Sequence, residues 1–248
     1  MRVVSVLRLR GEAGSQLAGV LFLITFARSI PALWAYQPVL DNPAGYIAGG
    51  GSDNRIFFGA LLEMFLIIAN VGTAVVLFPV LRRQSETLSL GYVTARIIES
   101  TFIAIGIVSV LAVVSLGQDP GSAASVGQDV ASAGGGAGAA GVALAAIKDW
   151  TFLLGPGFIV GFGNGLLLGY LMYTSGLVPR RMALLGLIGG PLIIASGIAV
   201  LFDVFQQGGA GQGIATIPEL LWELSLGIYL TVKGFKPSPI LDSVGSRT

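Results

Sequence analysis

The 248-residue chain contains no cysteine and no histidine. The absence of both excludes disulfides, thiol nucleophiles, Cys/His zinc sites and His-ligated haem. Histidine is also the side chain that ordinarily titrates near neutral pH, so proton chemistry there would have to be carried by carboxyl groups. The sequence predicts no metal site and no cofactor.

Charge is scarce as well. Asp, Glu, Lys and Arg make up 11% of the residues, against about 25% in a typical soluble domain. Hydrophobic residues make up 54%, and the mean hydropathy is +0.83. Apolar runs recur along the chain, each of about 20 residues, which is the length that a helix needs to cross a bilayer. These features predict an all-α, multi-pass membrane protein.

The apolar runs predict a six-helix transmembrane bundle that forms a single domain over residues 1–248. The expected spans are residues 16–36, 56–81, 91–116, 150–174, 182–205 and 217–233.

The placement of Lys and Arg predicts the orientation of these spans. The termini and the loops at 81–90 and 175–181 hold ten of these residues, whereas the three alternate segments hold only Arg55 and Lys148. Because Lys and Arg accumulate on the cytoplasmic side, both termini are expected in the cytoplasm. The ten residues are Arg2, Arg8, Arg10, Arg82, Arg83, Arg180, Arg181, Lys233, Lys236 and Arg247.

The connection at 117–149 is rich in glycine and alanine and falls on the non-cytoplasmic side. Its low complexity is typical of a flexible linker. A loosely held interfacial helix and a strap that binds a partner are the two alternatives.

Glycines recur every fourth residue in GPGFIVGFGNGLLLGY (155–170). A phosphate-binding loop would need a preceding strand and a following Lys-Ser/Thr, and neither is present. On a helix this period forms one smooth stripe that lets another helix approach closely. We therefore expect a packing face, with Asn164 beside it bonding a neighbouring helix, and a protein partner or second copy could also use such faces. The predicted packing residues are Gly157, Gly161, Gly165, Gly169, Gly186 and Gly190.

Ionisable residues inside spans are costly in lipid, so each is a functional candidate. Arg96 and Glu99 lie three residues apart on one helix face and are expected to form an ion pair in the cytoplasmic third of the membrane. The other candidates, for binding a ligand or a proton in the middle and outer half, are Arg28, Glu63, Asn70, Asp203, Glu219 and Glu223.

The outer acids allow two interpretations. In the first, Arg28 pairs with Glu63 or Glu223 and fixes the helix register, while the other acids stay wet at the rim. In the second, the acids converge in an outward-open polar cavity that takes a proton, a cation or a polar headgroup.

Three functions remain open on this basis. They are binding or transport of a small polar or amphipathic solute or proton, a structural or accessory role in a larger membrane complex, and an enzyme that acts on lipid, for which Glu219 and Asp203 are the only candidate carboxylates. No catalytic motif supports the enzyme and no catalytic residues are assigned, because no serine lies near a histidine and no paired-aspartate motif lies in facing spans. Membrane lipids are expected partners, and nucleic acid is not, since the basic residues form no patch.

Three segments together resemble the DUF4386 family of membrane proteins. They are ARIIES (95–100), LLLGYLMYTSGLVPRRMALLGLIGGPL (166–192) and IPELLWELSLGIYLTVKGF (217–235). The resemblance covers nearly the whole chain except the Gly/Ala-rich connection. It implies a compact bundle of six or seven helices in a prokaryotic cell membrane, and it implies no activity.

Overall fold

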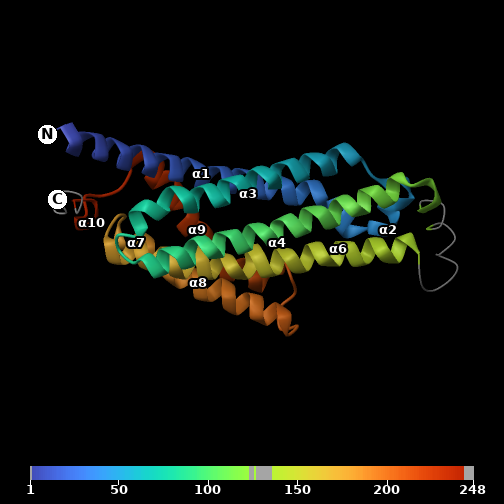
Figure 1. Ribbon diagram of the computed structural model, residues 1–248. Helices are drawn as coiled ribbons and strands as arrows, with labels where there is room; N and C mark the ends of the chain where they lie inside the picture. Colours follow the sequence, from blue (N-terminus) through green and yellow to red (C-terminus); the bar gives the residue numbers. More distant parts are fainter. Residues whose placement is uncertain (1, 123–125, 127–135, 243–248) are drawn as a thin grey trace. The chain divides into compact units, whose positions relative to one another are not determined.

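A computed structural model describes residues 2–122, 126 and 136–242, except for the side chains of residues 2–12, 50 and 242 (Figure 1). Helices and short turns account for the regular structure of this part of the chain, which contains no strand, so the all-α prediction is confirmed. The helices are α1 (Arg2–Asp41), α2 (Pro43–Gly45), η1 (Tyr46–Gly50), α3 (Asp53–Leu81), α4 (Glu86–Gln118), α6 (Ala137–Leu154), η2 (Gly155–Ile159), η3 (Gly161–Leu168), α7 (Gly169–Ser175), α8 (Arg180–Leu201), α9 (Ala210–Lys233) and α10 (Pro239–Asp242).

Five helical segments of the described chain are long and apolar enough to cross a membrane. They are Ala13–Asp41, Asp53–Leu81, Glu86–Gln118, Ala137–Ser175 and Arg180–Leu201. The sixth predicted span, 217–233, lies within α9, which is helical but not among the five. Its sequence carries Glu219, Glu223 and Lys233, which lower the apolar character of the helix.

The outward faces of these helices are apolar. Val108 is 67% exposed, Ile30 65% and Ile68 61%, and many other large hydrophobic residues are similarly exposed. A monomeric soluble protein rarely presents so much contiguous apolar surface. Such a surface is what lipid contact requires, and it fits a multi-pass membrane protein.

The fourth span begins well before its predicted start at residue 150. Helix α6 starts at Ala137, so the sequence AGAAGVALAAIKDW is helical rather than part of a linker. Alanine has the highest intrinsic helix propensity, so an Ala-rich tract can be helical even where its low complexity is typical of a linker. The rest of the predicted connection includes 123–125 and 127–135, which lie outside the described residues.

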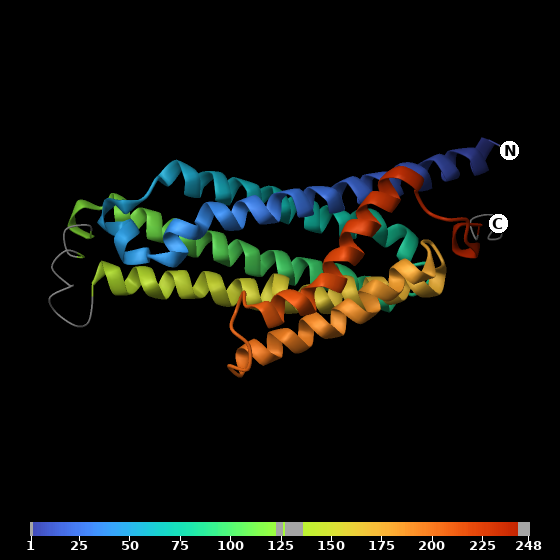
Figure 2. The ribbon, with the colours of Figure 1, turned by 180° about the vertical axis from the view of Figure 1, so that it is seen from behind.

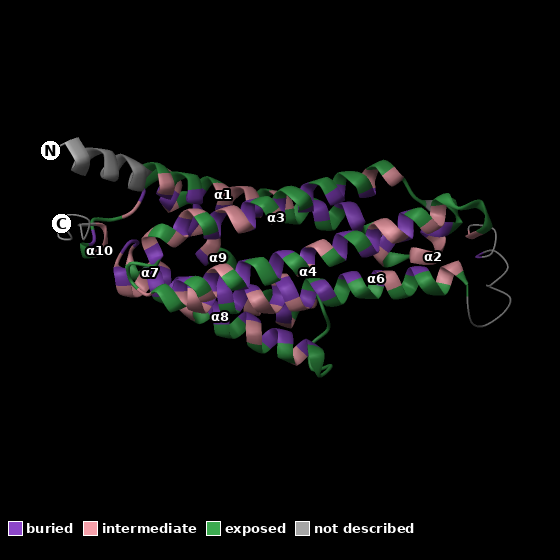
Figure 3. Ribbon diagram, viewed as in Figure 1, coloured by how far each residue is buried: buried purple, intermediate pink, exposed green. Residues whose placement is uncertain are grey.

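The chain divides into two compact units, and the boundaries between them fall within α1, α3 and α4. Unit 1 comprises Met1–Phe26, Ile68–Ser100 and Leu154–Thr248, and unit 2 comprises Ala27–Ile67 and Thr101–Leu153. Figure 3 shows buried positions recurring along the helices of both.

The apolar core of unit 1 contains Trp222 of α9, which is fully buried. Side chains from α1, α3, α4, η3, α7, α8 and α9 contribute to this core. They include Phe22, Leu77, Tyr92, Leu168, Leu171, Met172, Ala183, Leu226 and Leu230.

Unit 2 has its own core, in which Tyr36 and Val39 of α1 pack with Ile56 of α3 and with valines of α4. A polar contact ties its connections together. The Tyr46 hydroxyl donates to Asp53 Oδ1 at 2.5 Å, and Gln118 Nε2 donates to Asp53 Oδ2 at 2.9 Å. Asp53 therefore joins η1, the first turn of α3 and the last residue of α4.

Helix α8 packs on the glycine face of the fourth span, and α9 packs against α8 and also contacts η3 (Figure 2). A Cβ added to Gly161 would lie 2.7 Å from the carbonyl oxygen of Gly190, and one added to Gly190 would lie 2.5 Å from that of Gly161. A Cβ on Gly165 would collide with the Gly190 Cα. The two backbones therefore touch directly, and only glycine fits at these positions.

The remaining glycines of the stripe extend this contact. A Cβ on Gly169 would lie 3.3 Å from the Leu187 backbone nitrogen. One on Gly186 would lie 2.7 Å from the indole nitrogen of Trp222, so the second stripe accommodates a side chain of α9. Gly157 is buried in η2, and its carbonyl oxygen faces Gly197 of α8.

We expect Gly190→Ala to lower the free energy of unfolding by about 1–3 kcal/mol, because the added methyl overpacks the contact with Gly161. Gly213→Ala in α9 is the matched control, since no heavy atom lies within 4 Å of its added Cβ. Improved helix propensity should make the control neutral or more stable by roughly 1 kcal/mol. Thermal unfolding in one detergent measures both, and equal stabilities would contradict the direct backbone contact.

Candidate functional site

A buried polar network in unit 1 joins α3 and α4. Arg96 Nη1 contacts Glu99 Oε2 at 2.7 Å, and Asn70 Nδ2 donates to Glu99 Oε1 at 3.1 Å. Arg96 Nη2 also donates to Asn70 Oδ1, which closes the triangle. All three side chains are at most 5% exposed. The structure thus contains the Arg96–Glu99 pair and adds Asn70 to it.

A second group of polar side chains joins η3 and α9. Asn164 Nδ2 donates to Glu223 Oε1, and the indole Nε1 of Trp222 donates to the Asn164 carbonyl oxygen at 3.0 Å. Asn164 is fully buried, whereas Glu223 is only partly buried. The residues of η2 and η3 follow the wider π-helical turn, an uncommon geometry that often marks functional segments.

Glu219, one helical turn before Glu223, is 2% exposed. Neither of its carboxyl oxygens has a hydrogen-bond partner among the described residues. A Cβ added to Gly165 or to Gly189 would lie 2.8 Å from Glu219 Oε2. The carboxyl group is therefore enclosed by the bare backbones of η3 and α8.

These residues form one electrostatic group, which we name the acid cluster: Asn70, Arg96, Glu99, Asn164, Glu219 and Glu223. Arg96 interacts electrostatically with Glu99, Glu219 and Glu223. Three carboxyl groups and one guanidinium would sum to −3 + 1 = −2 if all were ionised. An excess of negative charge in a buried site requires protons or another cation.

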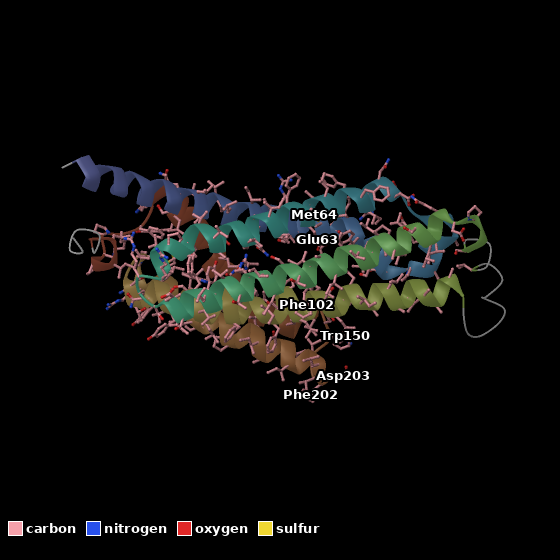
Figure 4. The ribbon with its side chains drawn as sticks, viewed as in Figure 1. Glu63, Met64, Phe102, Trp150, Phe202 and Asp203 are labelled. Atoms are coloured by element: carbon pink, nitrogen blue, oxygen red, sulfur yellow. The ribbon has the colours of Figure 1, made fainter. Side chains whose placement is uncertain are left out.

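Unit 2 contains a separate buried ion pair. Lys148 Nζ in α6 donates to both carboxyl oxygens of Glu63 in α3, at 2.6 and 2.7 Å, and lies 4.8 Å from the centre of the Tyr36 ring. Lys148 is 2% exposed and Glu63, labelled in Figure 4, is 5% exposed. Gly106 of α4 makes room for the lysine, since a Cβ there would lie 2.9 Å from its Cδ.

This pair corrects the interpretation in which Arg28 binds Glu63. Arg28 instead lies over the Phe65 ring, 5.4 Å from its centre, and Glu63 is neutralised by Lys148. Lys148 had been assigned to a non-cytoplasmic loop because the Ala-rich tract before it reads as linker. The Ala-rich tract and the apolar residues after Lys148 form one continuous helix, and this continuity is the sequence signal that would have placed Lys148 inside a helix.

The predicted binding residues are divided between the two units. Glu63 belongs to the ion pair of unit 2, whereas Asn70, Glu219 and Glu223 belong to the acid cluster of unit 1. Asp203 is exposed in the turn after α8, beside Phe202, with a positive φ of 56° (Figure 4). Glu219 is buried rather than wet at a rim.

Arg96 and Glu99 were placed at a different depth from Glu219, yet they interact with it electrostatically. Among the described residues, no group of three or more acidic side chains has a geometry that could hold a metal ion.

A family model described as a domain of unknown function, DUF4386, matches residues 17–234. The chain belongs to the DUF4386 family. The match covers α3, α4, α8 and α9, and with them every residue of the acid cluster. No curated protein and no solved structure gave a match to this DUF4386 chain.

We expect Lys148→Met to destabilise the protein by about 3–5 kcal/mol, because it leaves the Glu63 charge buried without a partner. The double variant Glu63→Met/Lys148→Met should recover most of this loss, since an apolar pair of similar volume replaces the ion pair. Lys236→Met, at an exposed lysine, serves as the control. Chemical unfolding measures the stability of all three variants. A double variant no more stable than Lys148→Met would contradict the conclusion that Lys148 and Glu63 neutralise one another.

Proposed function

We propose that this DUF4386 chain spans the membrane six times, with both termini in the cytoplasm. Helix α9 has 24 residues and is about 36 Å long, against about 30 Å for the bilayer core. Its acids lie on one face, while Ile214, Ile228 and Val232 are 68%, 49% and 71% exposed. With Lys148 in an ion pair, Arg55 is the single basic residue in the predicted outer segments, which strengthens the charge asymmetry.

The ligand we propose for the acid cluster is a small positively charged one, either a proton or a small polar organic cation. One observation carries this proposal: three buried or partly buried carboxyl groups share a single guanidinium. Ion pairing of Arg96 with Glu99 uses that guanidinium, so Glu219 and Glu223 are left without a compensating charge among the described residues. Binding there is the step that transport through the bundle would need.

A partner protein or second copy could bind the chain at another face. The glycine stripes are covered by α8 and α9 of the same chain, so a partner would have to contact the lipid-facing surface or the connection between α4 and α6. This proposal is independent of the acid cluster.

Proton binding near neutral pH is a direct test, because the chain has neither histidine nor cysteine. Between about pH 8 and pH 6, ordinary side chains contribute little, and the α-amino group supplies the expected background. We expect wild-type protein in lipid nanodiscs to take up about one more proton than Glu219→Gln/Glu223→Gln. Glu86→Gln, at an exposed glutamate, should match wild type.

Methylammonium is the probe for the organic-cation alternative. Isothermal titration with methylammonium chloride should show binding to the wild type that is lost in the same double variant. Equal proton uptake by wild type and double variant, together with no methylammonium binding, would overturn the proposed function.

A further inference from the structure

Glu219 differs from the other carboxyl groups of the acid cluster. Glu99 accepts hydrogen bonds from Arg96 and Asn70, and Glu223 accepts one from Asn164. Within the described part of the chain, neither oxygen of Glu219 has a hydrogen-bond donor, although the residue is 98% buried. A buried ionised carboxylate without a donor is strongly unfavourable, whereas a neutral carboxyl is tolerated far better.

The surroundings of Glu219 leave little room for a solute. Its Oε2 lies 2.8 Å from the point that a Cβ would occupy on Gly165, and equally close to that point on Gly189. The Gly189 Cβ position is also 2.5 Å from the Glu219 backbone nitrogen. Two helices approach the carboxyl through glycine, so their closeness depends on this absence of side chains. A proton adds no volume to such a contact.

We propose that the ligand of the acid cluster is a proton and that Glu219 is the residue that holds it. This inference rests on the proposed function and narrows it to one ligand and one residue. Binding forms an O–H bond on one Glu219 oxygen and cancels one negative charge, so the cluster goes from −2 to −1. Release breaks the same bond and returns the proton to water.

The titratable groups that act on Glu219 are Glu223 on its own helix and Arg96 and Glu99 on α4. Helix η3 contains no titratable residue, and those of α8, Arg180 and Arg181, lie at its first turn rather than near Gly189. Because Arg96 is engaged by Glu99 and Asn70, the nearest uncompensated neighbour is the carboxyl of Glu223. Its negative charge favours the neutral form of Glu219.

Carbon-13 NMR of the glutamate carboxyl groups tests this in the wild-type protein. The chain has six glutamates, at positions 12, 63, 86, 99, 219 and 223, so glutamate labelling gives a small set of signals. Their shifts distinguish neutral from ionised carboxyl groups. Single Glu219→Gln, Glu219→Asp, Glu223→Gln and Glu86→Gln variants assign the signals, and the two changes at Glu219 guard against one failing to fold.

At pH 6 in lipid nanodiscs, the lower end of the uptake window, we expect the Glu219 signal at the neutral position. The signals of Glu63 and Glu99, both held by cations, and of exposed Glu86 should lie at the ionised position. An ionised Glu219 overturns the inference. If Glu223 alone is neutral, the proposed function stands and the assignment to Glu219 fails. If all are ionised but methylammonium binds, the ligand is an organic cation and the inference fails. If methylammonium does not bind either, both fail.

Discussion

The direct contact between the backbones of η3 and α8 is the constraint on which the rest of unit 1 depends. Gly161, Gly165 and Gly190 bring the two helices closer than any side chain would allow. Dispersion and close packing are the main attractions between helices in lipid, because apolar side chains gain little there by leaving their surroundings. The same glycines also leave space for two large or polar groups of α9, the Trp222 indole and the Glu219 carboxyl. Packing and the candidate site therefore share one structural cause.

Buried charges are handled in two different ways in the two units. In unit 2, Lys148 Nζ donates to both carboxyl oxygens of Glu63, which is the arrangement expected of an ion pair that fixes the positions of helices. In unit 1, Glu99 and Asn70 accept hydrogen bonds from the two terminal nitrogens of Arg96, while Glu219 has no hydrogen-bond donor among the described residues. Because Lys148 already neutralises Glu63, this carboxylate needs no proton or other cation. Glu219, which has no such partner, is the carboxyl group suited to binding a proton.

Much of the fold could be predicted from the sequence, because apolar length and glycine period are local properties. Five of the predicted spans correspond to candidate membrane helices, and the residues that resemble DUF4386 lie within the matched range except for Phe235. The start of the fourth helix was misplaced, because Gly and Ala suit both a linker and a helix, and only tertiary contacts decide between them. Lys148 was missed for the same reason. The pairing of Glu63 with Lys148 and the surroundings of Glu219 both depend on which helices are neighbours. The periodicity of a single helix does not contain that information.

The Lys148–Glu63 pair also bears on how the chain enters the membrane. The two residues are separated by 85 positions, so the helix that carries Glu63 is synthesised well before the one that carries Lys148. A lone ionised side chain at the centre of a span costs about 3 kcal/mol on insertion scales. The early helix must therefore enter with an unpaired or protonated acid, or wait beside the insertion machinery. Completion of this part of the bundle is thus tied to the arrival of the fourth span.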